Sequence, residues 1–343
     1  MILPMHCILH PAMLRKHSFL LTSSLSARVN KRRHRLKRFQ ENSLTSPHHP
    51  HQILPHQPRQ PLAKSRSNSV SCDKLEKRNQ WLIIEGWQVN IDIYFKCTRC
   101  GNCCKELRVP LTVDEAVRWL SDGNPVQVLC EAISWLEEPP SSNRYAAYMR
   151  DRSFSAMAGR LPIRVLVTLV APLGNRCPNL LADNCCRIFE RRPLICRIYP
   201  AEINPFLELT PERRRCPPKA WQVGGNPLMR NAIYADSELR LLIRARLDQG
   251  IWDVPSQEAL CGALGIHVAA IMNEGYVVHS PNNARLFWAL LEAKERPLPV
   301  AQDWELISDR TETVKAVRSF GAKCSLASEH QSSTIEYLSL SAK

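Results

Sequence analysis

Cysteine is the residue type of this 343-residue sequence whose number and spacing point most directly to chemistry. There are fourteen cysteines, and ten of them fall between positions 97 and 216. Such crowding exceeds the ordinary use of cysteine as a small apolar residue. Thiolates bind zinc and iron, whereas a disulfide framework needs an oxidising compartment, and the sequence offers no credible secretory signal. We therefore expect the crowded cysteines to hold metal.

The first cluster reads Phe95-Lys96-Cys97-Thr98-Arg99-Cys100-Gly101-Asn102-Cys103-Cys104. Two cysteines separated by two residues can chelate one ion through a tight turn, and a glycine after the second one lets the backbone adopt a positive φ there. Cys103 continues the spacing, which is the three-ligand pattern of a four-iron cluster. Adjacent side chains are expected to diverge, so Cys104 is predicted to serve a second site or none.

A second group of cysteines follows in three segments, which are Cys177-Pro178-Asn179-Leu180, residues 186–200 and Cys216-Pro217. Together with the first cluster, these segments resemble the YkgJ-type CxxCxxCC cysteine-cluster family, described as a zinc- or iron-chelating domain. Its pattern runs F-x-C-x-x-C-G-x-C-C, then C-P-x-L, then C-x-I-[YF]-E-x-R-P-x-x-C-R-x-[YF]-P. Each part occurs here in order, between Phe95 and Pro217.

The resemblance implies eight metal ligands, which are Cys97, Cys100, Cys103, Cys104, Cys177, Cys186, Cys196 and Cys216. Cys185 stands one position before the family's cysteine, so it is expected to be a spare thiol unless it exchanges roles with Cys186. The cysteines without a neighbour at ligand spacing are expected to be isolated thiols, and these are Cys7, Cys72, Cys130, Cys261 and Cys324.

Arginines lie within a few residues of several cluster cysteines, where fixed guanidinium groups can neutralise the negative charge of metal-bound thiolates. We assign this role to Arg192 and Arg197. Zinc ribbons use two C-x-x-C pairs, and the second group of cysteines has none. A four-iron cluster takes three close cysteines and a remote cysteine followed by proline, which favours an iron–sulfur cluster. Eight ligands would equally serve two zinc sites.

The elements that must position these cysteines read as short helices and a few strands. Thr112-Val113-Asp114-Glu115 is a capping box that predicts a helix over 113–120. Further helices are predicted by periodicity, and strands by alternation or β-branching. The predicted helices are 125–136, 237–247, 257–264 and 283–294, and the predicted strands are 87–95 and 162–170. We expect an α+β fold, mostly short helices around a metal-centred cysteine-cluster domain, with a helical C-terminal part.

The formal charge of +14 is concentrated at the N-terminus. Residues 1–70 hold twelve of the 46 Lys and Arg residues and one acid, whereas residues 71–343 carry 34 basic and 31 acidic side chains. A nearly neutral body has no strong electrostatic attraction for nucleic acid. The predicted organisation is a disordered basic tail at 1–80, a cysteine-cluster metal-binding domain at 81–222, a helical part at 223–321 and a polar tail at 322–343.

The basic tail has four interpretations. It is an inert extension or the product of a start codon assigned too early, an organellar transit peptide, a weak nucleic-acid-binding segment, or a polyhistidine metal-binding stretch. No apolar stretch is long enough to span a membrane. The expected location is cytoplasmic, or organellar if the tail is a transit peptide.

Three functions are compatible with the sequence. The first is a metal-binding protein whose iron–sulfur or zinc centre transfers electrons or supports the fold, with an unknown protein or redox partner. The second is a protein-modifying enzyme, because the resemblance extends to flagellin lysine methylases. The third is an interaction module that zinc merely folds. No Gly-rich phosphate loop, nucleophile elbow or H-E-x-x-H motif occurs, so no catalytic residue is identified outside the cysteine cluster.

Overall fold

The computed structural model of the chain describes residues 92–224, 226–298, 301–330 and 333–340, which belong to one compact unit. The tail predicted for residues 1–80 lies outside the described residues, as does most of the strand predicted at 87–95. None of the helices in the described ranges is long and apolar enough to cross a membrane.

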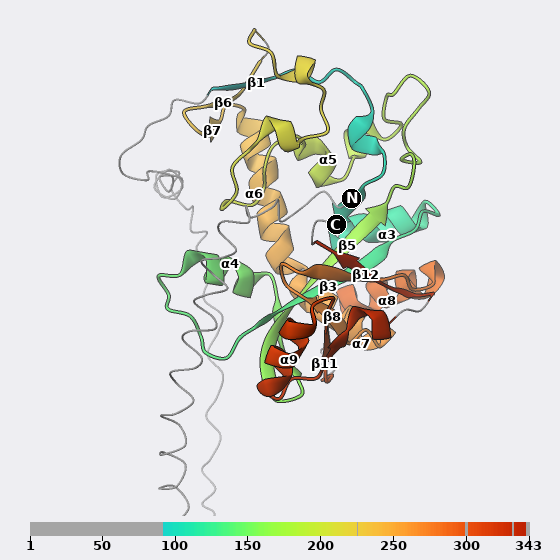
Figure 1. The fold of residues 1–343 in the computed structure, drawn as a ribbon. Coiled ribbons are helices and arrows are strands. Elements are labelled where there is room, and N and C mark those ends of the chain that lie inside the picture. The colour runs from blue at the N-terminus through green and yellow to red at the C-terminus, as the bar shows by residue number, and fades with distance from the viewer. Residues whose placement is uncertain (1–91, 225, 299–300, 331–332, 341–343) are drawn as a thin grey trace, which may run out of the picture. The chain divides into compact units, whose positions relative to one another are not determined.

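Helices and strands are interspersed along the described chain (Figure 1). The α-helices are α3 Val113–Ser121, α4 Arg144–Asp151, α5 Leu194–Ile198, α6 Ser237–Trp252, α7 Val254–Leu264, α8 Asn283–Glu295 and α9 Thr311–Ser319. The strands are β1 Ile93–Phe95, β2 Arg108–Leu111, β3 Gln127–Ser134, β4 Phe154–Ala158, β5 Leu161–Pro172, β6 Asn226–Arg230, β7 Ile233–Tyr234, β8 Val268–Ile271, β9 Gly275–His279, β10 Glu305–Ser308, β11 Cys324–Leu326 and β12 Ile335–Ser339. Short 3-10 turns include η2 Asn102–Cys104, η3 Phe189–Arg191, η4 Pro211–Arg213, η5 Pro218–Trp221 and η6 Ala327–Glu329.

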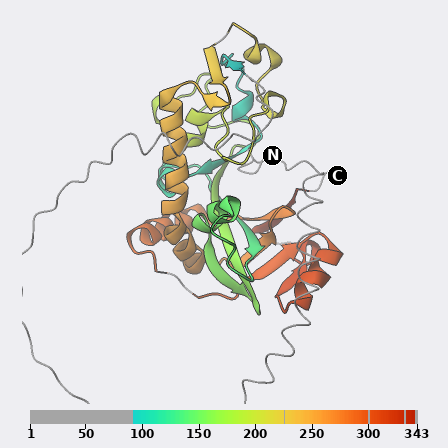
Figure 2. The ribbon, with the colours of Figure 1, turned by 90° about the vertical axis from the view of Figure 1, so that its left-hand side faces the viewer.

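A nine-stranded mixed sheet organises the molecule, with the path β11-β10-β8-β3-β5-β2 and with β4, β9 and β12 attached beside it. Its first three strands are parallel, because α8 and α9 provide the crossovers. The strands β2, β3, β4 and β5 are antiparallel. A separate three-stranded sheet, β1-β6-β7, adjoins the cysteine segments, and α6 runs from this small sheet to α7 (Figures 1 and 2).

The main core lies between the sheet and three helices. Apolar side chains of α3, α7 and α8 pack with those of β3 and β5, and Val128, Val165, Leu260, Leu286 and Leu290 are completely buried there. This core takes its residues from the chain between the two groups of cysteines and from the chain after them. It therefore fixes the strands β2 and β5, which lead from one group to the other.

The α+β class is confirmed, and so are most of the predicted elements. The capping box at Thr112 is present: its hydroxyl accepts from Glu115 N at 3.2 Å, and Thr112 N donates to the Glu115 carboxylate at 2.9 Å. The strand predicted at 162–170 is β5, and the helices predicted from residue 237 onward are α6, α7 and α8.

Other predictions were incomplete or wrong. The helix predicted at 125–136 is the strand β3, because Val128–Ala132 is buried on both faces of the sheet and therefore shows no alternation. The C-terminal part holds its predicted helices but also strands β6 to β10, which were not predicted. Two further strands, β11 and β12, lie within 322–343, for which a polar tail was predicted.

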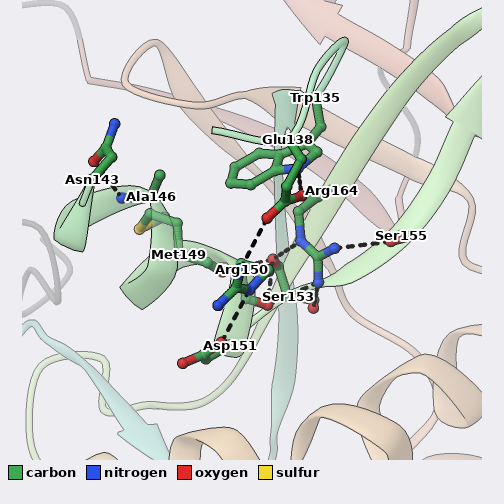
Figure 3. Close-up of polar contacts among 10 residues, drawn as sticks. All are labelled: Trp135, Glu138, Asn143, Ala146, Met149, Arg150, Asp151, Ser153, Ser155 and Arg164. Atoms are coloured by element: carbon green, nitrogen blue, oxygen red, sulfur yellow. Dashed lines mark hydrogen bonds and ion pairs between the residues drawn. The ribbon is translucent and has the colours of Figure 1, made fainter. Parts of the chain in front are cut away.

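An arginine in β5 joins the β4–β5 hairpin to the end of α4 (Figure 3). Arg164 donates to Ser153 Oγ at 2.8 Å, to Ser155 Oγ at 2.9 Å and to the carbonyl of Arg150 at 2.8 Å. Arg150 in turn pairs with Glu138 at 2.9 Å. Because one guanidinium satisfies several acceptors at a helix end, this network is structural.

Candidate metal centre

An antiparallel ladder brings the two cysteine segments together. β2 pairs with β5 over its full length. The pairing continues past the strand ends, where Leu173 N donates to Leu107 O at 2.8 Å and Cys177 N donates to Cys104 O, also at 2.8 Å. Two cysteines distant in the sequence are therefore held side by side by backbone hydrogen bonds that need no metal.

The first cysteine loop turns at Gly101, as predicted. Its φ is 73°, and a Cβ there would lie 3.0 Å from Asn184 Oδ1, so both the conformation and the space favour glycine. Cys104 N donates to Gly101 O at 3.0 Å and closes the turn. Cys97, Cys100 and Cys103 lie along this loop.

The segment from Cys177 to Cys196 folds back on the first loop. Leu180 and Cys186 form an antiparallel bridge, and Arg187 N donates to Asn179 O at 2.7 Å. These contacts hold Cys186 beside the turn that carries Cys177.

Helix α5, which carries Cys196, is held by the main body. The buried carboxylate of Glu115 accepts from Leu194 N at 2.7 Å, at the start of α5, while it also completes the capping box of α3. A single side chain thus ties a helix of the main core to a cysteine-bearing helix.

The last segment, around Cys216, closes over the first loop. Asn102 Nδ2 donates to Arg215 O at 3.3 Å, and Lys96 N donates to Ala220 O at 2.8 Å. The hydroxyl of Tyr199 accepts from Arg215 N at 2.8 Å and lies 3.9 Å from Cys216 Sγ. These contacts hold Cys216 near Cys97, Cys100 and Cys103.

The adjacent thiols of Cys103 and Cys104 do not diverge, contrary to the sequence-based expectation. Both lie in the tight turn η2, and their sulfurs are 4.0 Å apart. The hydrogen bond from Cys104 lowers the pKa of Cys103 to about 7, and Arg192 acts in the same direction. The pKa of Cys104 is raised by that hydrogen bond, by burial and by its thiol neighbours. Cys103 is thus the readily ionised member of the pair.

Burial and the neighbouring sulfurs raise the pKa of Cys177, Cys196 and Cys216. Burial is the main cause for Cys177 and Cys196, and each also feels the electrostatic repulsion of nearby cysteines. Burial likewise raises the pKa of Cys216 to about 11. A metal cation offsets both effects, because its charge stabilises the thiolates that burial and mutual repulsion disfavour.

The donor set fits zinc or an iron–sulfur cluster. All eight predicted ligands are free thiols that lie within a few segments, and soft thiolates are the ligands both centres prefer. In the arrangement described, no three Cys, His, Asp or Glu side chains in the described ranges lie close enough together to hold a metal ion. The residue types therefore match, while the sulfurs stand wider apart than a coordinated set.

The two selected arginines differ in position. Arg192 stacks on the ring of Phe189 at 3.8 Å, donates to Phe189 O at 2.8 Å and acts electrostatically on Cys103. Arg197 is directed to α6, where it lies 3.4 Å from Glu238. The proximity of Arg192 suits its predicted role, whereas Arg197 has a carboxylate partner outside the cluster.

The structure places the remaining cysteines apart from the predicted ligands. Cys185 lies beside Asp183, whose side chain raises the pKa of its thiol, whereas Cys186 is near enough to Cys177 and Cys196 to act on both electrostatically. Cys130 and Cys261 are completely buried in the main core, where they hydrogen-bond to each other rather than standing isolated. Cys324 is also buried, in β11, and Cys7 and Cys72 lie outside the described residues.

Sequence reasoning missed the residues that fix the last segment. The side chains of Glu202 and Arg214 are 7% exposed each and form an ion pair at 2.8 Å. Glu202 also accepts from the backbone N–H groups of Ile203 and Asn204. Of the residues that hold this segment, only Tyr199 was indicated by the sequence, because it falls within the motif around Cys196. The ion pair joins residues twelve positions apart in an irregular loop, where no periodicity reveals a contact.

Comparison with known proteins found one family model that matches the segment carrying this site. No curated protein and no solved structure matched the chain significantly. Residues 96–217, which contain all eight predicted ligands, match the family model CxxCxxCC, "Putative zinc- or iron-chelating domain". This description names zinc or iron, in agreement with the predicted cofactors.

Proposed function

We propose that this protein binds an iron–sulfur or zinc centre through its eight cluster cysteines, and that the centre transfers electrons or supports the fold. The observation that carries the proposal is the backbone ladder that sets Cys104 beside Cys177 and so joins two cysteine-rich segments. Such a concentration of thiols has little use in a folded chain without metal, because exposed thiols oxidise.

The chain's own residues supply the site in three ways. The cluster cysteines coordinate the metal through their sulfurs, and Arg192 lies where its positive charge offsets the negative charge of the thiolates near Cys103. The Glu202–Arg214 ion pair and Tyr199 hold the Cys216 segment in place. When bound, an iron–sulfur cluster supplies one-electron redox chemistry, whereas zinc supplies structural cross-linking. The expected partner is another protein or a redox protein rather than nucleic acid.

Anaerobic purification followed by metal analysis tests the proposal. We expect zinc or iron in the full-length protein, and an iron–sulfur cluster would add a visible absorption band near about 400 nm that zinc lacks. Cys186→Ser should lose metal, whereas Cys185→Ser should retain it, because Cys186 acts electrostatically on Cys177 and Cys196 while the thiol of Cys185 is engaged by Asp183. A full-length protein without zinc or iron would contradict the proposal, and equal metal loss in both variants would contradict the assignment of Cys186.

A further inference from the structure

We infer that the eight cysteines form two separate centres, one held by Cys97, Cys100, Cys103 and Cys216 and the other by Cys104, Cys177, Cys186 and Cys196. This inference rests on the proposed function and divides its ligands. The contacts that hold the cysteine segments together fall into two sets, and each set joins the segments that carry four of the cysteines.

The first set joins the loop 96–103 to the segment around Cys216. The backbone contact between Lys96 and Ala220 and the side-chain contact between Asn102 and Arg215 flank Cys97 and Cys100 in the loop and Cys216 in the later segment. Packing of Phe95 against Trp221, with ring centroids 4.9 Å apart, reinforces the same pairing. Cys97, Cys100 and Cys103 all act electrostatically on Cys216, in agreement with these contacts.

The second set joins Cys104 to the segments beyond β5. Cys177 N bonds to Cys104 O, and the bridge between Leu180 and Cys186 returns the chain to the same place. Cys104 interacts electrostatically with Cys177 and Cys196, and Cys196 interacts with Cys177 and Cys186. Cys177 and Cys196 also pack against the same main core, so this set of contacts joins the segments that carry these four cysteines.

Cys103 and Cys104 mark the boundary between the two groups. Cys103 is also a neighbour of Cys177 and Cys196, so proximity alone does not assign it. Its spacing does, because Cys97, Cys100 and Cys103 recur every third residue along one loop, while the backbone of Cys104 is already bonded to Cys177. The 4.0 Å between the two sulfurs then makes the centres adjacent.

Two centres of four thiols also satisfy coordination chemistry. Structural zinc takes four ligands, and a four-iron cluster takes four cysteines, whereas eight thiols exceed the need of either. Arg192 lies near Cys103 and therefore near this boundary, where the negative charge of two thiolate centres would be greatest.

Alkylation of the full-length, metal-loaded protein tests the division without any substitution. EDTA is added in steps, exposed thiols are labelled with N-ethylmaleimide, and the labelled positions are mapped by peptide mass spectrometry. We expect the cluster cysteines to become labelled in two sets of four that match the two groups, while Cys130 and Cys261 stay protected in the core. Labelling of all eight together, or in sets that mix the groups, would overturn the division.

Substitution of the boundary pair provides a second, matched measurement. Cys103→Ser should lose the metal of the first group and Cys104→Ser that of the second, so that each variant keeps a part and the double variant keeps none. Complete loss in either single variant, with the wild-type protein metal-loaded, would indicate one shared centre and leave the proposed function standing. A wild-type protein without zinc or iron would instead remove the proposed function itself.

Discussion

Two arginines are buried to nearly the same depth but differ in their surroundings. Arg214 pairs with Glu202 at 2.8 Å. Arg246, in α6, is 5% exposed, and within the part of the chain that the structure describes its Nε has no hydrogen-bond partner. Its charged neighbours are of both signs: Arg152 is another cation, whereas Asp253 is a buried carboxylate on which Arg246 acts favourably. Because its buried charge is matched less closely than that of Arg214, Arg246 is expected to contribute less to stability.

Replacing each arginine by methionine should therefore have unequal effects. Arg214→Met should lower the free energy of unfolding by about 3–5 kcal/mol, because it leaves the buried carboxylate of Glu202 unpaired. Arg246→Met should lower that free energy by less, because no ion pair at hydrogen-bond distance is broken among the described residues. Urea denaturation of both variants measures the difference. Equal losses in the two variants would show that Arg246 has a stabilising role that its contacts do not reveal.

At the scale of elements, Glu115 links α3 to α5 and thereby the main core to a cysteine-bearing helix. Glu115→Ala should lower the free energy of unfolding by about 1–3 kcal/mol, because a helix cap is lost and two backbone donors lose their acceptor. Asp114→Ala is the matched control, since Asp114 is half-exposed and pairs on the surface with Lys294. Its loss should stay within about 0.5 kcal/mol. Urea denaturation would contradict the assignment if the two variants were equally destabilised.

Elements whose signals are local could be predicted from the sequence. The capping box identified α3, and β-branched residues identified β5. The strand β3 was missed because both of its faces are buried: Val128, Cys130 and Ala132 lie in the main core and Leu129 in a second apolar cluster on the other face. Burial of both faces removes the alternation by which a strand is recognised. The short parallel strands β10 and β11 depend on tertiary pairing in the same way.

The candidate site could be predicted to a similar extent. The motif supplied the eight cysteines and the turn at Gly101. The motif did not supply the proposed division of the cysteines into two groups, because that division depends on long-range contacts such as the one between Lys96 and Ala220. The roles of Glu115 and Glu202 depend equally on partners far away in the sequence or in irregular loops.

At the scale of the whole molecule, one histidine makes stability depend on pH. His279, at the end of β9, is 5% exposed, and its Nε2 lies 2.9 Å from Val268 O of β8. Burial lowers the pKa of His279 from its ordinary value of 6.5, and nearby His267 acts in the same direction. The unfolded chain therefore takes up the proton first as the pH falls. The contribution of His279 to stability is complete above about pH 6.5 and declines below it.

We expect the melting temperature of the protein to fall between pH 7 and pH 5, and the fall to be smaller in His279→Gln. Glutamine keeps an amide donor for Val268 O but has no proton to gain in this range. Melting curves of both proteins at the two pH values measure the difference. An equal fall in the variant would assign the pH dependence to other groups.

The ladder between β2 and β5 has a consequence for how the protein acquires its metal. The strands are built from core residues, and their pairing extends to Cys104 and Cys177. The entropy of closing the long chain between these cysteines is therefore met by sheet formation and not by the ion. Unlike a zinc finger, which is unfolded without metal, this chain is expected to take up and release metal while folded. Uptake should then be first order in free metal, with no preceding refolding step.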